Sequence, residues 1–114
     1  MNNLVHWEIP TTDMERSTAF YTGLFGWRFE AFSPQYAMFG VEGGVGGALT
    51  QVDRMPEPCI EVYIGVDDIP GVLARAEELG ASVIQPKTEI GEGMGFWAAF
   101  ADPCDCRIGI WAEG

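Results

Sequence analysis

The feature that most constrains this chain is an internal repeat. Val5–Ile9 alternates apolar and polar residues and is followed by an aspartate and a helical pattern, and Ile60–Ile64 repeats this arrangement. Since successive strand residues face opposite sides of a sheet, His6 and Glu61 are predicted to occupy equivalent positions. A polar residue at the same position of both repeats indicates a site at the junction of two half-domains.

Each repeat is predicted to fold as βαβββ, which gives an α+β protein. The predicted strands are Leu4–Ile9, Trp27–Phe32, Tyr36–Val41, Val45–Val52, Cys59–Val66, Ser82–Gln85, Gly95–Ala101 and Arg107–Trp111, and the predicted helices are Met14–Phe25 and Ile69–Leu79. The 114 residues form one domain with repeats at about 3–54 and 58–112, joined by the proline-rich Met55–Pro58. Two such units side by side would make a half-open curved sheet, whose concave face is a natural pocket.

The helix boundaries and buried faces follow from local signals. Thr12 and Glu15 have the spacing of a capping box, and Gly26 can adopt the left-handed conformation that ends a helix. Helical spacing predicts two buried stripes. They are Ala19, Phe20 and Leu24 in the first helix, and Ile69, Val72, Leu73, Ala76 and Leu79 in the second.

Charge and cysteine content exclude several classes of function. The net charge is -11 and only six Lys and Arg residues are present, which argues against nucleic acid and anionic membranes as partners. No apolar run approaches the length of a membrane span, and the N-terminal residues lack a signal-peptide pattern. Three cysteines fit a reducing compartment better than a disulfide scaffold, so we expect a cytoplasmic protein.

Two motifs that invite functional interpretations are better explained structurally. Gly43–Gly47 lacks the spacing and the strand-to-helix context of a phosphate-binding loop. We instead expect that Gly46 or Gly47, which has no side chain, allows a ligand or another backbone segment to approach closely. Cys104–Cys106 does not have the spacing of redox motifs, and we interpret it as a hairpin turn with exposed thiols.

Several phrases, in order along the chain, resemble the vicinal oxygen chelate superfamily, which includes glyoxalase I, bleomycin-resistance proteins, fosfomycin-resistance enzymes and extradiol dioxygenases. These phrases are Phe20-Tyr21, Phe25-Gly26-Trp27, Val66-Asp67-Asp68-Ile69, Ala76-Glu77-Glu78-Leu79-Gly80 and Phe100-Ala101-Asp102-Pro103. The resemblance extends from about Leu4 to Trp111, and it is close to single-module glyoxalase-like members. It implies a fold of two βαβββ units.

The resemblance also implies four metal-ligand positions, on the first and last strands of each unit. The first-strand positions fall on His6 and Glu61, and the last-strand positions fall near Gly47, with Leu49 facing the core, and on Gly109. Glycine offers no ligand, which disfavours glyoxalase I activity itself. If a divalent metal (Zn, Ni, Mn or Fe) binds, His6 and Glu61 are its candidate ligands, with Glu61 also the candidate catalytic carboxylate.

Other arrangements of these groups remain open. Glu8 could complete a three-ligand site with His6 and Glu61, or His6 and Glu61 could pair without a metal. Alternation also turns a further set of candidate ligand-binding residues to the concave side: Glu8, Tyr63, Arg107 and Trp111.

Three functions are compatible with these residues. The mixture of aromatic and charged groups suits a small oxygen-rich or planar molecule, so our main hypothesis is a small-molecule-binding protein that acts as a homodimer. The alternatives are a divalent-metal-dependent lyase, isomerase or dioxygenase, and a non-catalytic structural or regulatory module.

Overall fold

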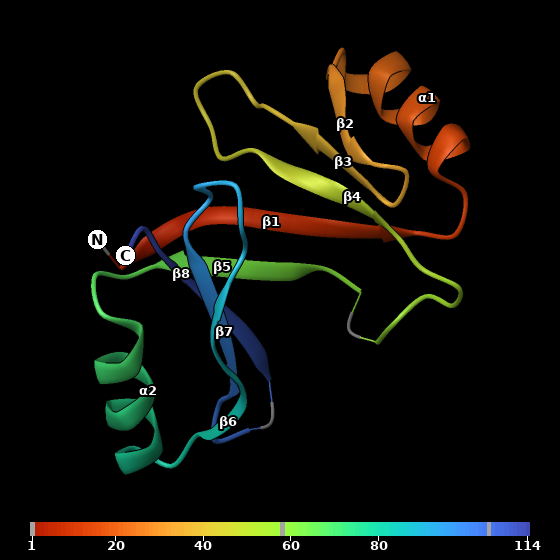
Figure 1. Cartoon of the computed structure of the whole chain (residues 1–114). Helices are drawn as coiled ribbons and strands as arrows, with labels where there is room; N and C mark the ends of the chain where they lie inside the picture. Colours follow the sequence, from red (N-terminus) through yellow and green to blue (C-terminus); the bar gives the residue numbers. More distant parts are fainter. Residues whose placement is uncertain (1, 58, 105) are drawn as a thin grey trace. The chain divides into compact units, whose positions relative to one another are not determined.

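The chain folds in the predicted order, β-α-β-β-β followed by a second β-α-β-β-β (Figure 1). This computed structural model describes residues 2–57, 59–104 and 106–114. The elements are β1 (Asn3–Thr11), α1 (Met14–Phe25), β2 (Phe29–Ser33), β3 (Tyr36–Phe39), β4 (Gly47–Gln51), β5 (Glu61–Gly65), α2 (Ile69–Glu78), β6 (Ser82–Glu89), β7 (Phe96–Ala101) and β8 (Arg107–Ala112). The predicted α+β class is confirmed, whereas the predicted division into one domain with two repeats stays a prediction.

The residues divide into two compact units. The first unit is His6–Glu61, and the second unit comprises Met1–Val5 and Val62–Gly114. In the first unit β1 pairs with β4 in parallel, and β4, β3 and β2 pair successively in antiparallel fashion. The second unit repeats this pattern, with β5 parallel to β8 and with β8, β7 and β6 antiparallel.

The core of the first unit is aromatic. Trp27 stacks on Phe39 with ring centroids 4.3 Å apart, and Trp7 meets the Phe39 ring edge-on at 5.6 Å. The Trp7 indole N–H donates to the Val45 carbonyl at 2.8 Å. Tyr21 is the aromatic residue of α1 that joins this core, because its ring stacks on Trp27 at 5.4 Å.

The predicted buried stripe of α1 is wrong. Phe20 and Leu24 are 58% and 59% exposed, and Ala19 is also exposed. The partly buried face of the helix is formed instead by Met14, Ser17, Thr18 and Tyr21. Apolar residues at helical spacing therefore did not identify the inward face, because the aromatic core selects Tyr21.

The N-terminal cap of α1 also differs from the predicted capping box. Asp13, not Thr12, is the N-cap, and its carboxylate accepts a hydrogen bond from the Arg16 backbone N–H at 3.1 Å. Asp13 is held in turn by Thr11, whose hydroxyl oxygen accepts from the Asp13 N–H. The predicted C-terminal residue is confirmed, since Gly26 has a φ of 74° and its N–H donates to the Thr22 carbonyl.

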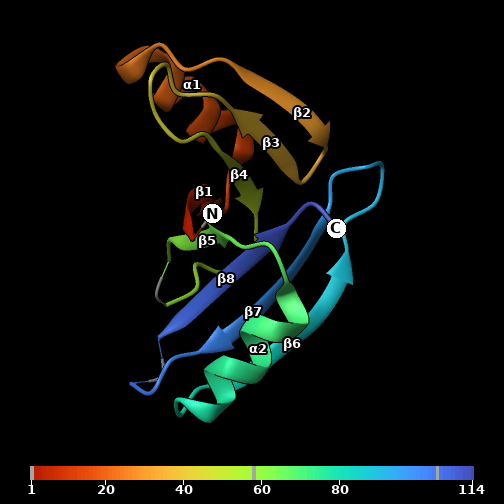
Figure 2. The ribbon, with the colours of Figure 1, turned by 90° about the vertical axis from the view of Figure 1, so that its left-hand side faces the viewer.

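In the second unit α2 lies against β6, β7 and β8 (Figure 2). The buried core is aliphatic and combines the helix with the sheet; its members are Val66, Ile69, Leu73, Ala98, Ile110 and Ala112. Of the predicted α2 stripe, Ile69 and Leu73 are buried and Val72 packs against the core, but Leu79 is 62% exposed. Asp68 caps this helix by accepting from the Gly71 N–H.

The hairpin predicted around Cys104–Cys106 is confirmed at its described positions. It connects the antiparallel strands β7 and β8, and the Asp102 carboxylate accepts hydrogen bonds from the backbone N–H groups of Cys104 and Cys106, both at 2.9 Å. Both thiols are exposed. Asp105 of this turn and Pro58 of the predicted joint lie outside the described residues.

No described helix is long and apolar enough to cross a membrane.

Candidate functional site

Three polar side chains of the first unit share hydrogen bonds on one face of its sheet. The Tyr36 hydroxyl donates to Glu8 Oε2 at 2.7 Å. His6 Nε2 lies 3.1 Å from the same Glu8 oxygen and 2.9 Å from the Tyr36 hydroxyl oxygen. We call these three residues the His6–Glu8–Tyr36 triad. Side-chain exposure is 24% for His6 and 15% for Glu8, so the triad is largely enclosed but remains reachable.

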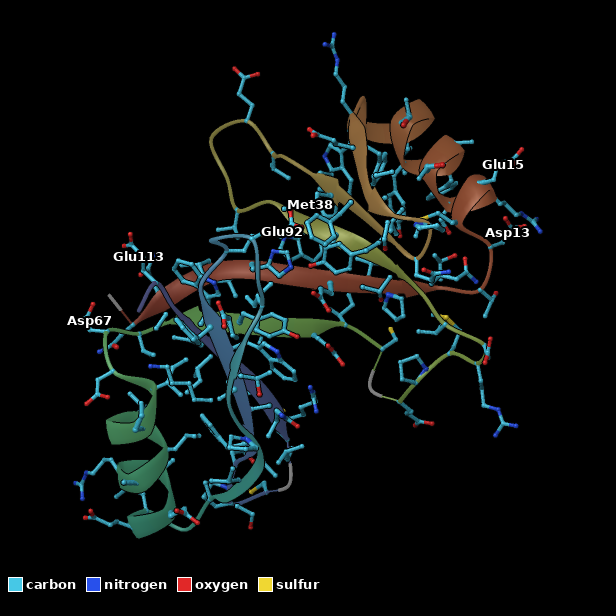
Figure 3. The ribbon with its side chains drawn as sticks, viewed as in Figure 1. Asp13, Glu15, Met38, Asp67, Glu92 and Glu113 are labelled. Carbon is cyan, nitrogen blue, oxygen red and sulfur yellow. The ribbon has the colours of Figure 1, made fainter. Side chains whose placement is uncertain are left out.

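Strand register explains why the triad forms. His6 and Glu8 are two residues apart on β1 and therefore share a face. Glu8 pairs with Ala48 of β4, and Ala48 pairs with Met38 of β3, which is labelled in Figure 3. Paired residues of neighbouring strands point to the same side, so Tyr36, two residues before Met38, also lies on this face.

The surroundings of Glu8 favour its ionised form. Burial of the side chain by itself raises the pKa of the Glu8 carboxyl. The hydrogen bonds from His6 and Tyr36, the charge of His6 and a hydrogen bond shared with the Glu61 side chain together outweigh burial. The net result is a pKa below the usual range for a glutamate. Glu8 is therefore the anionic centre of the triad.

We expect Glu8→Gln to destabilise the protein more at neutral pH than in acid. A carboxyl whose pKa is lowered in the folded state contributes its full stability above its unfolded-state pKa of about 4.3, and this contribution is lost as pH falls through the folded-state value. The difference in free energy of unfolding between wild type and Glu8→Gln should thus be largest near neutral pH. Urea titrations at about pH 7 and about pH 3.5 measure it.

The matched control for this prediction is Glu30→Gln, which removes one exposed carboxylate from β2 of the same unit. A Glu8→Gln difference that is equal at both pH values, or larger in acid, would contradict the assignment of Glu8 as a stabilised anion.

The predicted ligand position on β4 is wrong. Gly47 pairs with Trp7, and Leu49 pairs with Ile9, so Gly47 shares the core-facing side with Leu49 and not the side of His6. A side chain has no room there, because a Cβ on Gly47 would collide with the Trp7 carbonyl oxygen. This confirms the alternative expectation of a close backbone approach. The residue on the His6 face is Ala48, which offers no metal ligand either.

In the second unit the glycine at the other predicted ligand position is covered by an aromatic ring. Gly109 pairs with Tyr63, and a Cβ on Gly109 would lie 2.5 Å from two carbon atoms of the Tyr63 ring. Arg107 and Trp111, two residues to either side of Gly109 on β8, share this face with Tyr63. The Trp111 indole N–H donates to the Met94 carbonyl at 2.9 Å.

The predicted site residues are therefore divided between the units. His6, Glu8 and Glu61 belong to the first unit, and Tyr63, Arg107 and Trp111 belong to the second. Their convergence on one cavity stays a prediction.

The described side chains do not fit the metal that the resemblance implies. Within residues 2–57, 59–104 and 106–114, no three His, Cys, Asp or Glu side chains gather as a metal site requires. The three-ligand arrangement of His6, Glu8 and Glu61 is thus not formed, and the Nε2 atom of His6 is engaged within the triad.

A groove of about 480 Å³ lies between α2 and the sheet of the second unit. It is lined mainly by apolar residues, including Ile64, Val72 and Phe100, with Arg75 and Asp68 among the polar ones. None of the predicted site residues lines it, so this groove is not the site that the strand pattern predicts.

Tyr36 is the site residue that sequence reasoning missed. The sequence pattern predicts a strand at Tyr36, but the proximity of Tyr36 to Glu8 depends on the pairing of β3 with β4 and of β4 with β1. The signal for its face is the alternation along β3, in which the partly buried Tyr36 and Met38 alternate with the buried Ala37 and Phe39.

Comparisons with known proteins agree with the fold. Residues 3–44 match the family model described as bleomycin resistance protein-like N-terminal. A glyoxylase-like domain-containing protein of Didymella fabae is 30% identical over 93 residues, covering 74% of this chain and 73% of that protein. CFP32 of Mycobacterium tuberculosis is 29% identical over 114 residues, covering 91% of this chain. The chain spans only 43% of the length of CFP32.

A solved structure extends the similarity to the whole fold. A glyoxalase/bleomycin resistance protein/dioxygenase superfamily member from Vibrio splendidus 12B01 has a TM-score of 0.72 with this chain at 16% sequence identity. The match covers 96% of this chain and 97% of the other. At this identity the likeness concerns the fold.

Proposed function

The chain belongs to the vicinal oxygen chelate superfamily as a glyoxalase-like protein, and on this basis we propose that it binds a small oxygenated molecule through the His6–Glu8–Tyr36 triad. The ligand is held by hydrogen bonds to an imidazole, a carboxylate and a phenol. The oxygen-rich or planar character of the ligand follows from these groups and from the aromatic residues beside them.

The shared hydrogen bonds of the triad are the observation that carries this proposal. Polar groups that are largely enclosed and mutually oriented are typical of pockets that fix the orientation of a ligand. The Tyr36 ring also meets Phe32 edge-on, with ring centroids 6.1 Å apart, which provides an apolar wall for a flat molecule.

The metal-dependent alternative has less support from the described residues. It needs a Lewis acid to polarise two neighbouring oxygen atoms of the substrate and a carboxylate to move a proton. His6 and Glu61 remain candidates for those roles, but the donors that would complete a metal site are absent from the triad's neighbours Ala48 and Met38.

We further propose that Tyr63, Arg107 and Trp111 bind a ligand on the sheet face that they share within the second unit. Arg107 is the residue suited to a ligand carboxylate, which a guanidinium binds with two parallel hydrogen bonds. Arg107→Ala should weaken binding of carboxylate-bearing ligands specifically, and unchanged binding of such ligands would exclude this role.

A thermal-shift screen of small oxygenated metabolites, with and without Mn, Ni, Zn and Fe, tests the proposed function. We expect stabilisation by a subset of metabolites in the absence of metal, since binding to the folded state alone raises its stability. That stabilisation should be lost in His6→Ala and reduced in Tyr36→Phe.

The control variant is Tyr21→Phe, which removes a tyrosine hydroxyl from the aromatic core of the same unit and leaves the triad unchanged. Stabilisation that requires metal, together with turnover abolished by Glu61→Gln, would favour the metal-dependent enzyme and overturn the proposal. An absence of any ligand in the screen would favour the structural or regulatory module.

Assembly and location are part of the proposal. The exposed Phe20, Leu24 and Phe25 of α1 form an apolar surface that a second copy would cover, which supports a homodimer. Sedimentation of the protein as a monomer at concentrations on the order of tens of micromolar would exclude the homodimer.

The three exposed free thiols support the reducing cytoplasm as the location of the protein. Localisation of a tagged protein tests this proposal.

A further inference from the structure

We propose that the groove beside α2 in the second unit (the α2 groove) is a separate ligand site, which binds a molecule with a straight apolar chain and one terminal carboxylate. Its volume of about 480 Å³ lies within the range of small-molecule pockets. All its lining residues belong to the second unit, and none belongs to the two sites proposed above. The α2 groove therefore goes beyond the proposed function.

The floor of the α2 groove is a patch of isoleucine side chains on one face of the sheet. Ile64 of β5 pairs with Ile110 of β8, and Ile108 lies two residues before Ile110, so the three side chains point to the same side. Ile64 and Ile108 are only partly buried. Leu79, which is 62% exposed, lines the same groove just after α2. Apolar surface that is gathered in a concave place and left partly open is typical of a ligand site.

The helix brings one carboxylate and one guanidinium to this apolar groove. Of the described residues that line it, Asp68 and Arg75 are the charged ones. They are seven residues apart and therefore lie on the same side of α2, about 10 Å apart along its axis. Val72 lies between them on that side and continues the apolar wall. The groove is thus apolar between an anionic end and a cationic end.

The cationic end is suited to a ligand carboxylate. Arg75 Nη1 donates to Glu78 Oε2 at 3.1 Å, and both side chains are 66% exposed. An exposed ion pair of this kind contributes little to stability, so a ligand carboxylate can replace Glu78 as the partner of Arg75. A guanidinium holds a carboxylate with two parallel hydrogen bonds, while the chain of the ligand covers the isoleucine floor.

The anionic end restricts the ligand to one carboxylate. Asp68 is the N-cap of α2, and its carboxylate accepts a hydrogen bond from the Gly71 N–H at 3.2 Å. A chain that begins at Arg75 and follows the groove ends beside this negative charge. A second carboxylate would be repelled there, and one placed over the isoleucine floor would lose its hydration. The site therefore selects monocarboxylates over dicarboxylates.

Three eight-carbon probes test the proposal: octanoate, 1-octanol, which lacks the charge, and octanedioate, which carries a second carboxylate. Binding is followed through ¹³C-labelled isoleucine methyl groups at about 0.15 M salt, where a Debye length of about 8 Å screens the net charge of -11. We expect saturable shifts at Ile64, Ile108 and Ile110 and none at the exposed Ile84. Octanoate should bind about tenfold more tightly than either other probe, as a hydrogen bond to a charged group allows.

Two substitutions at the cationic end should act in opposite directions. Arg75→Gln should remove the preference for octanoate over 1-octanol, because the partner of the carboxylate is lost. Glu78→Gln should strengthen octanoate binding by up to about fivefold, because Glu78 no longer competes for Arg75. The matched control is Arg16→Gln, which removes an exposed arginine from α1 and should leave octanoate binding unchanged.

A fourth substitution tests the position of the site. Ala76 lines the groove and is partly buried, so Ala76→Phe should place a ring in the groove and weaken octanoate binding by tenfold or more, as about 1.4 kcal/mol of lost contact would. Circular dichroism shows whether this variant is folded. Unweakened binding in the folded variant would place octanoate elsewhere and overturn the proposal.

Other results would also overturn the proposal. They are equal affinity for octanoate and 1-octanol, an unchanged preference in Arg75→Gln, and shifts that extend to Ile84 as in detergent-like binding. The same holds if no probe gives saturable shifts up to about 10 mM, a concentration that suffices for ligands of this size. Shifts of the groove methyl signals on dilution without a probe would assign the groove to a second copy of the chain instead. None of these results changes the proposed function, which the metabolite screen tests separately.

Discussion

Gly47→Ala is expected to lower the free energy of unfolding by about 3 kcal/mol or more, at the upper end of the cost of overpacking. The added Cβ would collide with the Trp7 carbonyl oxygen and lie 2.9 Å from the Trp7 carbonyl carbon. The Trp7 carbonyl group belongs to the backbone and cannot rotate away as a flexible side chain can. It is also held in place by the parallel pairing of β1 with β4. Chemical denaturation of both proteins measures the difference.

The matched control is Gly40→Ala. A Cβ at Gly40 meets nothing within 4 Å, and its φ lies outside the left-handed region, so the change in stability should stay within about 0.5 kcal/mol. Equal, small effects of the two substitutions would mean that the close contact between β1 and β4 is not maintained in solution.

Leu73→Ala is expected to cost about 2–5 kcal/mol, the range for deleting a buried leucine side chain. Leu73 is 8% exposed and belongs to the aliphatic core between α2 and the sheet of the second unit. The loss combines the transfer free energy of the removed groups with the cavity they leave. Urea denaturation followed by circular dichroism measures it.

Leu79→Ala provides the comparison, because Leu79 follows the same helix but is 62% exposed. Its substitution should change stability by no more than about 0.5 kcal/mol. A Leu73→Ala effect as small as this would mean that α2 is not packed as the structure has it.

The element order was predictable because the relevant signals are local. Strand alternation, the glycine after α1 and the aspartate that caps α2 act within a few residues of one another. The same is true of the hairpin after β7, where Asp102 binds the backbone of its own turn. Interactions over such short distances are encoded in the sequence pattern itself.

The two helices show where local signals fail. In α2 the residues at helical spacing include Ile69 and Leu73, and these are buried as predicted. In α1 the same logic selected Phe20 and Leu24, which are exposed, whereas Tyr21 contacts Trp27. Spacing identifies an apolar stripe, but the ring stacking available in the aromatic core determines which face turns inward.

The candidate site was predictable in part. Alternation on β1 correctly placed His6 and Glu8 on one face, but their partner Tyr36 comes from a strand about thirty residues away, as the 28-residue separation of Glu8 and Tyr36 shows. The position of Gly47 was also misassigned, since residues two apart on a strand share a face and Gly47 therefore lies on the same side as the core-facing Leu49.

The sequence by itself determined the order of helices and strands, the family, and the placement of an imidazole and a carboxylate two residues apart on one strand. Each of these depends on periodicity or short-range chemistry. Only the tertiary structure decided that Tyr36 joins His6 and Glu8 and that Gly47 lies against the carbonyl of Trp7. Both depend on how β1, β3 and β4 align, and strand register is set by packing across the sheet, since a shift of one residue would turn every side chain to the opposite face.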